Sequence, residues 1–337
     1  MISEIRQLTI GIPVRNEEKT LSEFIYSLQA AVELLDENII VETIVCLNGS
    51  SDNSEQIIDD LIEKLANSRI KLKKVYSIEG KINAQNTIIR TRQFSSFICF
   101  LDADILLDKN CLATLWNTMI TNPSLQVAYA RVQPISVEHK TLVEWLQSIH
   151  YKYPEVLTPR KYFHGRGYML RSCEAFSAVN KPDKESKQNS VDLDKYRRLK
   201  LEKIPQIDDV YLSRVIAHEC GLDSIKEIQN AIVYFVPPRA LYDFYQGQKR
   251  LMLEILKLNL LFPEHAYLQK NHFARHMNYR AFKTLSISEQ IHYLGYRVFE
   301  FVIKTLVRGK LWLSLQGILN IGKFWIPLKT TKKFYKR

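Results

Sequence analysis

Two carboxylates placed two residues apart are the feature of this sequence that points most directly to chemistry. Asp102 and Asp104 follow an apolar run at residues 97–101. Carboxylates at positions i and i+2 can together hold a hard divalent cation through their oxygens, and such a cation commonly bridges phosphates. The same pattern in isolation also fits an ordinary Asx turn after a buried strand. The spacing therefore predicts a cation site, provided that neighbouring elements bring a phosphate-bearing ligand to it.

The first 130 residues alternate between short β-branched runs and amphipathic stretches. This pattern predicts right-handed βαβ units and a largely parallel sheet, in which ligands bind at the carboxyl ends of the strands. The polar loops 13–18, 48–54 and 102–104 follow three of the expected strands and should therefore share one edge. The expected strands are residues 8–12, 39–47, 70–78 and 97–101, and the expected helices are residues 21–35, 54–65, 82–92 and 112–120.

Composition and charge divide the 337-residue chain. With 46% hydrophobic and 25% charged residues it is typical of a globular protein. Residues 181–203 are charged and poor in bulky apolar side chains, which indicates an inserted segment at about 180–206. After Pro237 and Pro238 the sequence becomes helical and aromatic. We therefore expect an α/β domain over residues 1–237 and a helical, basic region over residues 238–337.

The number of cysteines and the distribution of apolar residues indicate the cellular compartment in which the protein is expected. The five cysteines are odd in number and form no CxxC pair, which favours a reducing, cytoplasmic environment. The first ten residues lack the apolar stretch of a signal peptide. No segment has the roughly 20 mostly apolar residues that span a bilayer. The expectation is a cytoplasmic protein without a membrane-spanning helix.

Six short segments of the sequence occur in a recognisable order. They are IPVRNEE at 12–18, NGSSDNS at 48–54, Gly80-Lys81 with Ala84 and Asn86, FLDAD at 100–104, GRGYMLR at 165–171 and IDDVYL at 207–212. Each segment alone is a weak signal, whereas six in order are specific. Together they resemble the motifs of the family-2 glycosyltransferases, whose nucleotide-binding half has the GT-A fold. The resemblance covers residues 7–236 and implies a mixed, mostly parallel, Rossmann-like sheet flanked by helices, here with a C-terminal helical extension.

The resemblance implies a role for each matching residue. Asp102 and Asp104 would hold Mn²⁺ or Mg²⁺ against the diphosphate of a nucleoside-diphosphate sugar. Asp209 would be the base that deprotonates the acceptor hydroxyl, with Asp208 orienting or tuning it, and a single displacement would invert the anomeric centre. Both acids also fit the first turn of a helix at 210–220, where they would act only as caps. The residues implied to contact the donor are Pro13, Arg15, Asn16, Glu17, Asn48, Ser50, Lys81, Asn86, Asp102 and Arg250.

Two departures from the family pattern bear on the base of the sugar nucleotide and on the number of sugars transferred. Asn48 stands where the family usually has Asp, and its amide carries donors as well as an acceptor, which weakens the case for uracil and leaves guanine or another base open. A UDP-sugar stays the first expectation, and a GDP-sugar is the alternative. Processive members carry Gln-x-x-Arg-Trp, but here Gly247 and Leu251 stand at the Gln and Trp positions around Arg250. We therefore expect transfer of a single sugar to a glycan or lipid-linked acceptor, in cell-envelope or exopolysaccharide assembly.

The C-terminal region concentrates the positive charge. Residues 297–337 contain ten Lys and Arg and one acid, Glu300, within a net charge of +11 for the chain. Interleaved aromatic, aliphatic and basic residues are typical of helices in a membrane interface, and no nucleic-acid-binding module is present. We expect peripheral contact with an anionic membrane on its inner face and no nucleic-acid partner. The alternative is a helix pair packed on the catalytic domain.

Two other functions are compatible with an α/β sheet of this kind. A sugar-1-phosphate nucleotidylyltransferase shares the sheet architecture, but its glycine-rich loop is missing after the first strand, where the sequence reads PVRN at 13–16. A catalytically degenerate, membrane-docked binding protein would retain the fold without the reaction. The intact Asp102, Asp104 and Asp209 favour an enzyme over this second rival.

Overall fold

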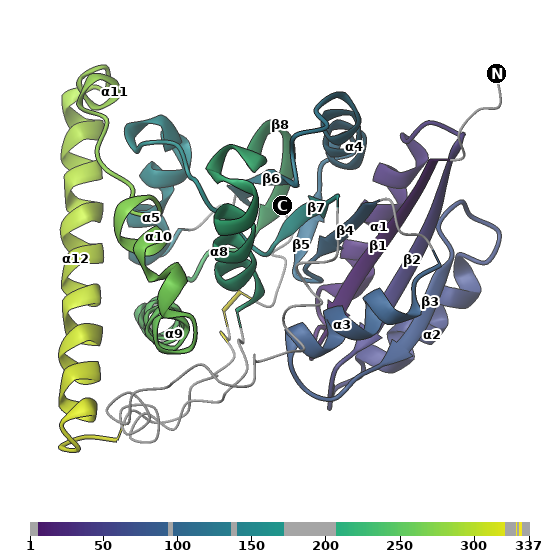
Figure 1. Ribbon diagram of the computed structural model, residues 1–337, viewed down its shortest axis with the longest axis horizontal. Coiled ribbons are helices and arrows are strands. Elements are labelled where there is room, and N and C mark those ends of the chain that lie inside the picture. Colours follow the sequence, from purple (N-terminus) through teal and green to yellow (C-terminus); the bar gives the residue numbers. More distant parts are fainter. Residues whose placement is uncertain are drawn as a thin grey trace.

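A mixed, mostly parallel sheet lies at the centre of the computed structural model, which describes residues 6–93, 97–135, 140–171, 207–320, 328 and 330–331 (Figure 1). Its eight strands have the order β3-β2-β1-β4-β7-β6-β8-β5. The insertion expected at about 180–206 lies outside the described residues. The strands are β1 (Arg6–Val14), β2 (Ile39–Leu47), β3 (Leu72–Tyr76), β4 (Phe97–Leu101), β5 (Ile105–Leu107), β6 (Val127–Pro134), β7 (Gly167–Leu170) and β8 (Ile225–Phe235).

Helices cover both faces of this sheet and then continue as a C-terminal helical region (Figure 1). This is the α/β architecture with a helical extension that the sequence predicts. The expected helices of the first 130 residues are present, with ends within a few residues of the predicted ones. The helices are α1 (Leu21–Glu33), α2 (Ser54–Lys64), α3 (Lys81–Thr91), α4 (Cys111–Thr121), α5 (Leu142–Lys152), α8 (Asp208–Cys220), α9 (Leu241–Leu261), α10 (Ala266–Asn271), α11 (Tyr279–Lys283) and α12 (Ile287–Leu315).

Strand directions bring the predicted loops to one edge of the sheet. β1 pairs in parallel with β2 and β4, and β2 pairs in parallel with β3. The carboxyl ends of these four strands therefore lie side by side, as expected. β7 runs antiparallel to β4 with Gly167 opposite Leu101, so β7 begins at the edge where β4 ends. The loop that precedes β7 consequently joins the same edge.

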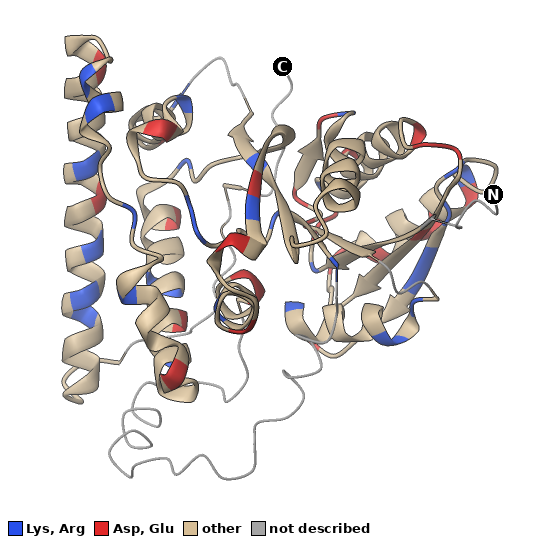
Figure 2. Cartoon of the chain, turned by 45° about the horizontal axis from the view of Figure 1, so that its top comes forward, with Lys and Arg blue, Asp and Glu red and all other residues tan. Residues whose placement is uncertain are grey.

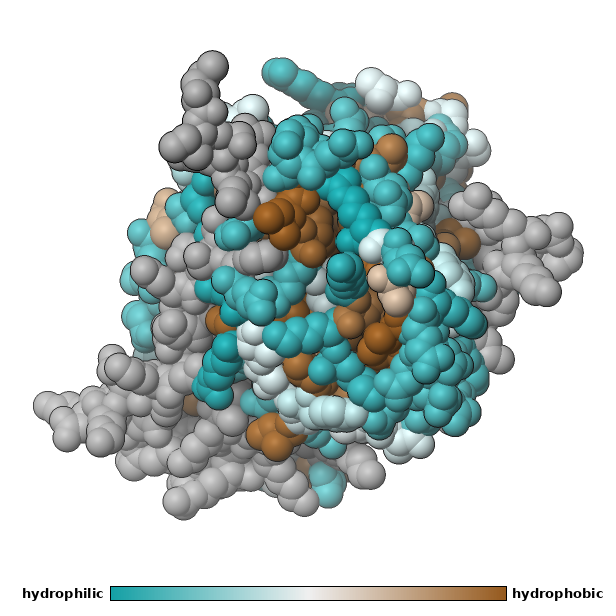
Figure 3. Space-filling view, turned by 90° about the vertical axis from the view of Figure 1, so that its right-hand side faces the viewer, coloured by the Kyte–Doolittle hydropathy of each residue, from teal (hydrophilic) through white to brown (hydrophobic). Residues whose placement is uncertain are grey.

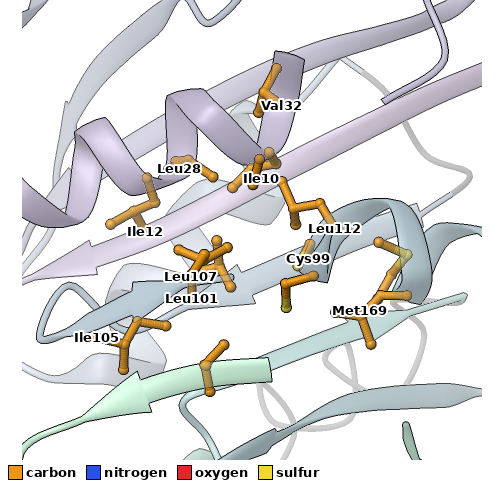
Figure 4. Close-up of a cluster of buried hydrophobic side chains, with 14 of the residues drawn as sticks. Ile10, Ile12, Leu28, Val32, Cys99, Leu101, Ile105, Leu107, Leu112 and Met169 are labelled. Carbon is orange, nitrogen blue, oxygen red and sulfur yellow. The ribbon is translucent and has the colours of Figure 1, made fainter. Parts of the chain in front are cut away.

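Alternation along the strands builds a core on each face of the sheet. Successive side chains of a strand point to opposite faces. On one face, Ile10 and Ile12 of β1 pack with Leu28 and Val32 of α1 (Figure 4). On the other face, Phe100 of β4 belongs to a second cluster with residues of α3 and α8. Because every central strand is covered on both faces, the loops at its ends are the parts of the sheet that remain accessible.

The C-terminal helices pack against the sheet domain through α5 and α9. Leu253 of α9 packs with Val307 and Leu311 of α12, while Tyr293 and Tyr296 of α12 lie in a cluster with residues of α5. α12 is a single helix of 29 residues, and one of its faces is buried. The basic tail beyond residue 320 falls outside the described residues except for 328 and 330–331.

Candidate active site

The ammonium group of Lys81 joins the two aspartate pairs. Lys81 is the first residue of α3, and its Nζ lies 2.6 Å from Asp102 Oδ1 and 3.1 Å from Asp208 Oδ1. It also donates to the carbonyl oxygen of Gly165 at 3.1 Å. Burial alone would lower the pKa of Lys81, but the charges of Asp102 and Asp208 outweigh this effect and raise it. Lys81 is therefore a fixed positive charge at the edge of the sheet.

Asp208 is held by hydrogen bonds on both of its oxygens. Its Oδ2 accepts from Gln85 Nε2 at 2.7 Å and from the Tyr168 hydroxyl at 2.9 Å, while Oδ1 faces Lys81. The side chain is buried. In addition, the backbone N–H of Ile207 donates to Glu254 of α9 at 3.3 Å, which ties the start of α8 to the helical region. Asp208 thus fixes Lys81 and α8 in place.

Asp209 has a different environment from its neighbour. It is half-buried, and its two oxygens accept backbone N–H bonds from Gly165 at 2.8 Å and from Val210 at 2.7 Å. Burial and the charge of Asp208 raise the pKa of Asp209 to about 6, against the opposing effect of Lys81. A carboxylate that is partly accessible and has a raised pKa is suited to accept a proton near neutral pH.

Asp102 and Asp104 occupy a short link between two strands. β4 ends at Leu101 and β5, which the sequence pattern did not predict, begins at Ile105. Burial and the charge of Asp102 raise the pKa of Asp104 to about 6, while Arg166 and Lys81 oppose the shift. The two carboxylates therefore repel one another across this link. A divalent cation held between them would relieve that repulsion.

Gly165 lies where a side chain would collide with the charged network. A Cβ at this position would be 2.8 Å from Lys81 Nζ and 3.1 Å from Asp208 Oδ1. Its carbonyl oxygen accepts from Lys81 and its N–H donates to Asp209, so both of its backbone polar groups are hydrogen-bonded. The segment 165–171 is one of the six family-like motifs of the sequence. Its first residue is glycine because a larger side chain would collide with Lys81 and Asp208.

The loops after β1 and β2 are fastened to each other. The N–H of Asn16 donates to Ser50 Oγ at 3.2 Å, and Ser51 N–H donates to Asn16 Oδ1 at 2.8 Å. Glu17 N–H donates to Ser54 Oγ at 2.8 Å. Asn16 has a φ of 55°, a left-handed conformation that Asn tolerates better than most residues. These contacts hold the loops together, while the predicted donor contacts of Asn16, Glu17 and Ser50 stay predictions.

The remaining predicted donor residues lie along the same edge. Pro13 is in β1 opposite Cys46 of β2, and Arg15 forms an ion pair of 2.5 Å with Glu79. Asn48 is buried directly after β2, and its Oδ1 accepts no hydrogen bond within the described part of the chain. Asn86 is half-buried on α3.

Arg250 reaches the site from α9. Burial lowers the pKa of its guanidinium, and the charge of Asp104, together with those of Asp209 and Asp102, opposes this shift. Arg250 therefore lies within the electrostatic field of three of the four aspartates.

Within the described residues, no cluster of three or more His, Cys, Asp and Glu side chains could hold a metal ion.

The amino-acid sequence matches the model of a known protein family. Residues 9–179 match the model of the glycosyl transferase family 2, which is half of the chain. The chain belongs to glycosyl transferase family 2. The match contains the loops after β1, β2 and β4 and the start of β7, and it ends before Asp208 and Asp209. The two acids of α8 are therefore assigned by motif and geometry rather than by the family match.

Solved glycosyltransferase structures resemble this family-2 chain at low identity. Glucosyl-3-phosphoglycerate synthase from Mycobacterium tuberculosis, in complex with Mn²⁺, UDP-glucose and phosphoglyceric acid, is 16% identical, with 76% of this chain and 80% of that chain covered and a TM-score of 0.47. The mannosyltransferase PcManGT from Pyrobaculum calidifontis, in complex with GDP-Man and Mn²⁺, is 14% identical, with 92% and 84% covered and a TM-score of 0.49. TarS (residues 1–349) from S. aureus is 15% identical, with 93% and 88% covered and a TM-score of 0.43. No curated protein matches the sequence significantly.

Several residues of the candidate site were not singled out from the sequence. Gln85 and Tyr168 hold Asp208, and Glu254 anchors the residue before it. Gln85 follows Lys81 by four residues on α3, so both lie on one face of the helix, a signal that was available in the sequence. Tyr168 and Glu254 approach Asp208 from β7 and α9, and no local pattern connects them with it.

Proposed function

We propose that this glycosyltransferase moves one sugar from a nucleoside-diphosphate sugar to an acceptor hydroxyl, with inversion and with the help of a divalent metal ion. The observation that carries the proposal is the single network that joins Asp102, Lys81, Asp208, Gly165 and Asp209 at the edge of the sheet. Charge-neutralising groups for a leaving diphosphate and a basic carboxylate meet there, as a direct displacement requires.

The residues present suit a divalent cation shared with the substrate. Mg²⁺ is commonly held by one or two carboxylates together with substrate phosphates and water. Asp102 and Asp104 would supply the carboxylates, and their mutual repulsion supports the presence of a cation between them. A bound Mn²⁺ or Mg²⁺ would neutralise charge on the departing nucleoside diphosphate. Lys81, already fixed beside Asp102, would add a second positive charge there.

Asp209 is the proposed general base. Its carboxylate is half-buried and oriented by two backbone N–H groups, and its raised pKa of about 6 leaves it mostly ionised at neutral pH. Asp208 is unsuited to the role because its oxygens are already engaged by Gln85, Tyr168 and Lys81. We assign Asp208 to positioning Lys81 and the first turn of α8. Attack by the acceptor from the face opposite the diphosphate would invert the anomeric carbon.

The same proposal includes the donor, the acceptor and the pathway, which we infer from the motifs of the sequence. A UDP-sugar is the first candidate donor, and Asn48 leaves a GDP-sugar open as the alternative, because an amide can both donate to and accept from a base. Gly247 and Leu251 near Arg250 support transfer of one sugar rather than processive synthesis. A glycan or lipid-linked acceptor in envelope or exopolysaccharide assembly fits a single-sugar transferase of this family.

A donor screen with a site variant tests the proposal. We expect a UDP- or GDP-sugar with Mn²⁺ to raise the unfolding temperature of the protein, because a ligand that binds only the folded state stabilises it by mass action. Asp104→Ala should abolish both this shift and sugar transfer, whereas Asp60→Ala, at an exposed carboxylate on α2, should change neither. Full transfer by Asp104→Ala, or by the wild type in excess EDTA, would refute the metal role. Donor binding without transfer to any acceptor would favour a degenerate binding protein.

A further inference from the structure

α12 presents hydrophobic side chains on two opposite faces. Its inner face is buried against α5 and α9. Its outer face carries a second apolar stripe along the length of the helix, and the eight large side chains of this stripe are 47–77% exposed. We call this set the outer face of α12; its members are Ile287, Ile291, Leu294, Val298, Phe301, Val302, Leu306 and Trp312. A surface helix of a globular protein normally places polar residues there.

Charged residues of α12 border this face, and four of the six are basic, while the acid Glu289 pairs with Lys152 of α5. Arg297 and Lys304 each form an ion pair of 2.7 Å with Glu300, which leaves this trio with a net positive charge. Neither Arg308 nor Lys310 has a carboxylate within ion-pair distance in the described part of the chain, and Lys and Arg recur along α12 (Figure 2). An apolar stripe bordered by cations is the pattern of a helix that lies in the plane of an anionic membrane interface.

We propose that the outer face of α12 docks on an anionic lipid bilayer, with the helix axis parallel to the membrane plane. Charge complementarity favours a bilayer over a second copy of this chain. Pairing two α12 helices through the same stripe would bring Arg297, Lys304 and Arg308 of one copy near the same cations of the other, with only Glu300 to offset them. Anionic headgroups would instead pair with these cations while the apolar side chains enter the acyl boundary.

α5 widens the proposed docking surface. The indole of Trp145 stacks on the imidazole of His292 at a centroid distance of 3.8 Å, and Trp145 itself is about half exposed. Leu142, one turn earlier on α5, is more exposed still. Tryptophan is enriched at the level of lipid headgroups because one part of its ring is polar and the rest is apolar. Trp145 and Trp312 would therefore lie at the headgroup level.

The location of α12 suits docking of the whole molecule. α12 forms one side of the protein, with α9 and α5 between it and the sheet (Figure 1). On the opposite side, hydrophobic residues occur as separate small groups among hydrophilic ones (Figure 3). No helix in the described part of the chain is long and apolar enough to cross a membrane. α9 packs on α12 through Leu253 and carries Arg250 toward the aspartates, so α12 and α9 would lie between the bilayer and the site.

Vesicle binding tests this inference without any use of enzymatic activity. Full-length protein is sedimented with vesicles of phosphatidylglycerol and phosphatidylcholine, and with vesicles of phosphatidylcholine alone. We expect binding to the anionic vesicles that weakens at high salt without disappearing, because the apolar contribution is not screened. The double variant Val298→Ser/Phe301→Ser should lose about tenfold or more in vesicle affinity. Its inner face and the basic tail are unchanged, so the thermal unfolding temperature should stay near that of the wild type.

Two controls separate this face from other causes of binding. Leu34→Ser removes an exposed apolar side chain directly after α1, and this variant should bind vesicles as the wild type does. Arg308→Gln should weaken binding to anionic vesicles only. Wild-type protein that fails to sediment with anionic vesicles at low salt would overturn the proposal, and so would undiminished binding by Val298→Ser/Phe301→Ser. A dimer that this double variant dissociates, without vesicle binding by the wild type, would assign the face to a second copy instead.

Discussion

At the scale of single residues, the two neighbouring acids of α8 are expected to differ in what their loss does. Asp209→Asn removes the proposed base but keeps a carbonyl oxygen toward the backbone N–H groups of Gly165 and Val210. We expect kcat to fall by about a hundredfold or more, the usual scale for a lost general base, with donor affinity nearly unchanged. Steady-state kinetics together with donor titration would measure both quantities.

Asp208→Asn is the matched variant for Asp209→Asn, and its effect should appear in the dependence of kcat/KM on pH. A base must be ionised to act, so kcat/KM of the wild type should rise with pH through about 6, the pKa of Asp209. The charge of Asp208 contributes to that raised pKa, so Asp208→Asn should move the rise to lower pH. Asp208→Asn also releases Lys81, which should weaken donor binding. An unmoved profile in Asp208→Asn, or a nearly fully active Asp209→Asn, would show that the base is another residue.

At the scale of elements, the loop before β7 and the helix α12 should respond oppositely to one added methyl group. Gly165→Ala places a Cβ 2.8 Å from Lys81 Nζ, which three oxygen partners hold in place. We expect lower stability and loss of most transfer activity. Gly309→Ala has open space around its Cβ and lies within a helix, so it should stabilise the protein by about 0.5–1 kcal/mol. Chemical denaturation would measure both changes, and equal effects at the two sites would contradict the proposed crowding at Gly165.

At the scale of the whole molecule, the half-buried acids Asp104 and Asp209 should make the free energy of unfolding depend on pH. Asp104 and Asp209 both have a pKa of about 6 in the folded chain, above the ordinary value of an aspartate. An acid with a raised pKa binds its proton more tightly when folded, so its contribution to stability is lost as pH rises from about 4 through about 6. Over that range, metal-free wild type should lose about 1 kcal/mol or more of unfolding free energy relative to Asp104→Asn/Asp209→Asn.

Denaturation curves at a series of pH values in the presence of a chelator would measure this difference. Asp60→Asn, at an exposed carboxylate of α2, should follow the wild type. Parallel curves for the wild type and the double variant would mean that the two acids titrate at ordinary values in the folded protein.

The sequence by itself determined the four parallel strands β1–β4, the edge at which they end and the family. β-branched runs separated by amphipathic helices predict parallel strands, and parallel strands place their carboxyl ends together whatever the details of packing. The positions of the loops at 13–18, 48–54 and 102–104 therefore followed from local pattern alone. The same holds for the first turn of α8, because acids before an apolar-periodic stretch are favoured at a helix N-terminus.

Only the tertiary structure decided how these pieces meet. The contact of Lys81 with Asp208 joins residues far apart in the sequence, and it depends on the reversed direction of β7, which brings Gly165 to the edge where β4 ends. The sequence likewise showed α12 as apolar and basic, yet only its packing on α5 and α9 separates a buried face from an exposed one. The physical reason is the same in both cases: periodicity along a chain fixes which side chains share a face, whereas the partner of that face depends on the packing of the whole molecule.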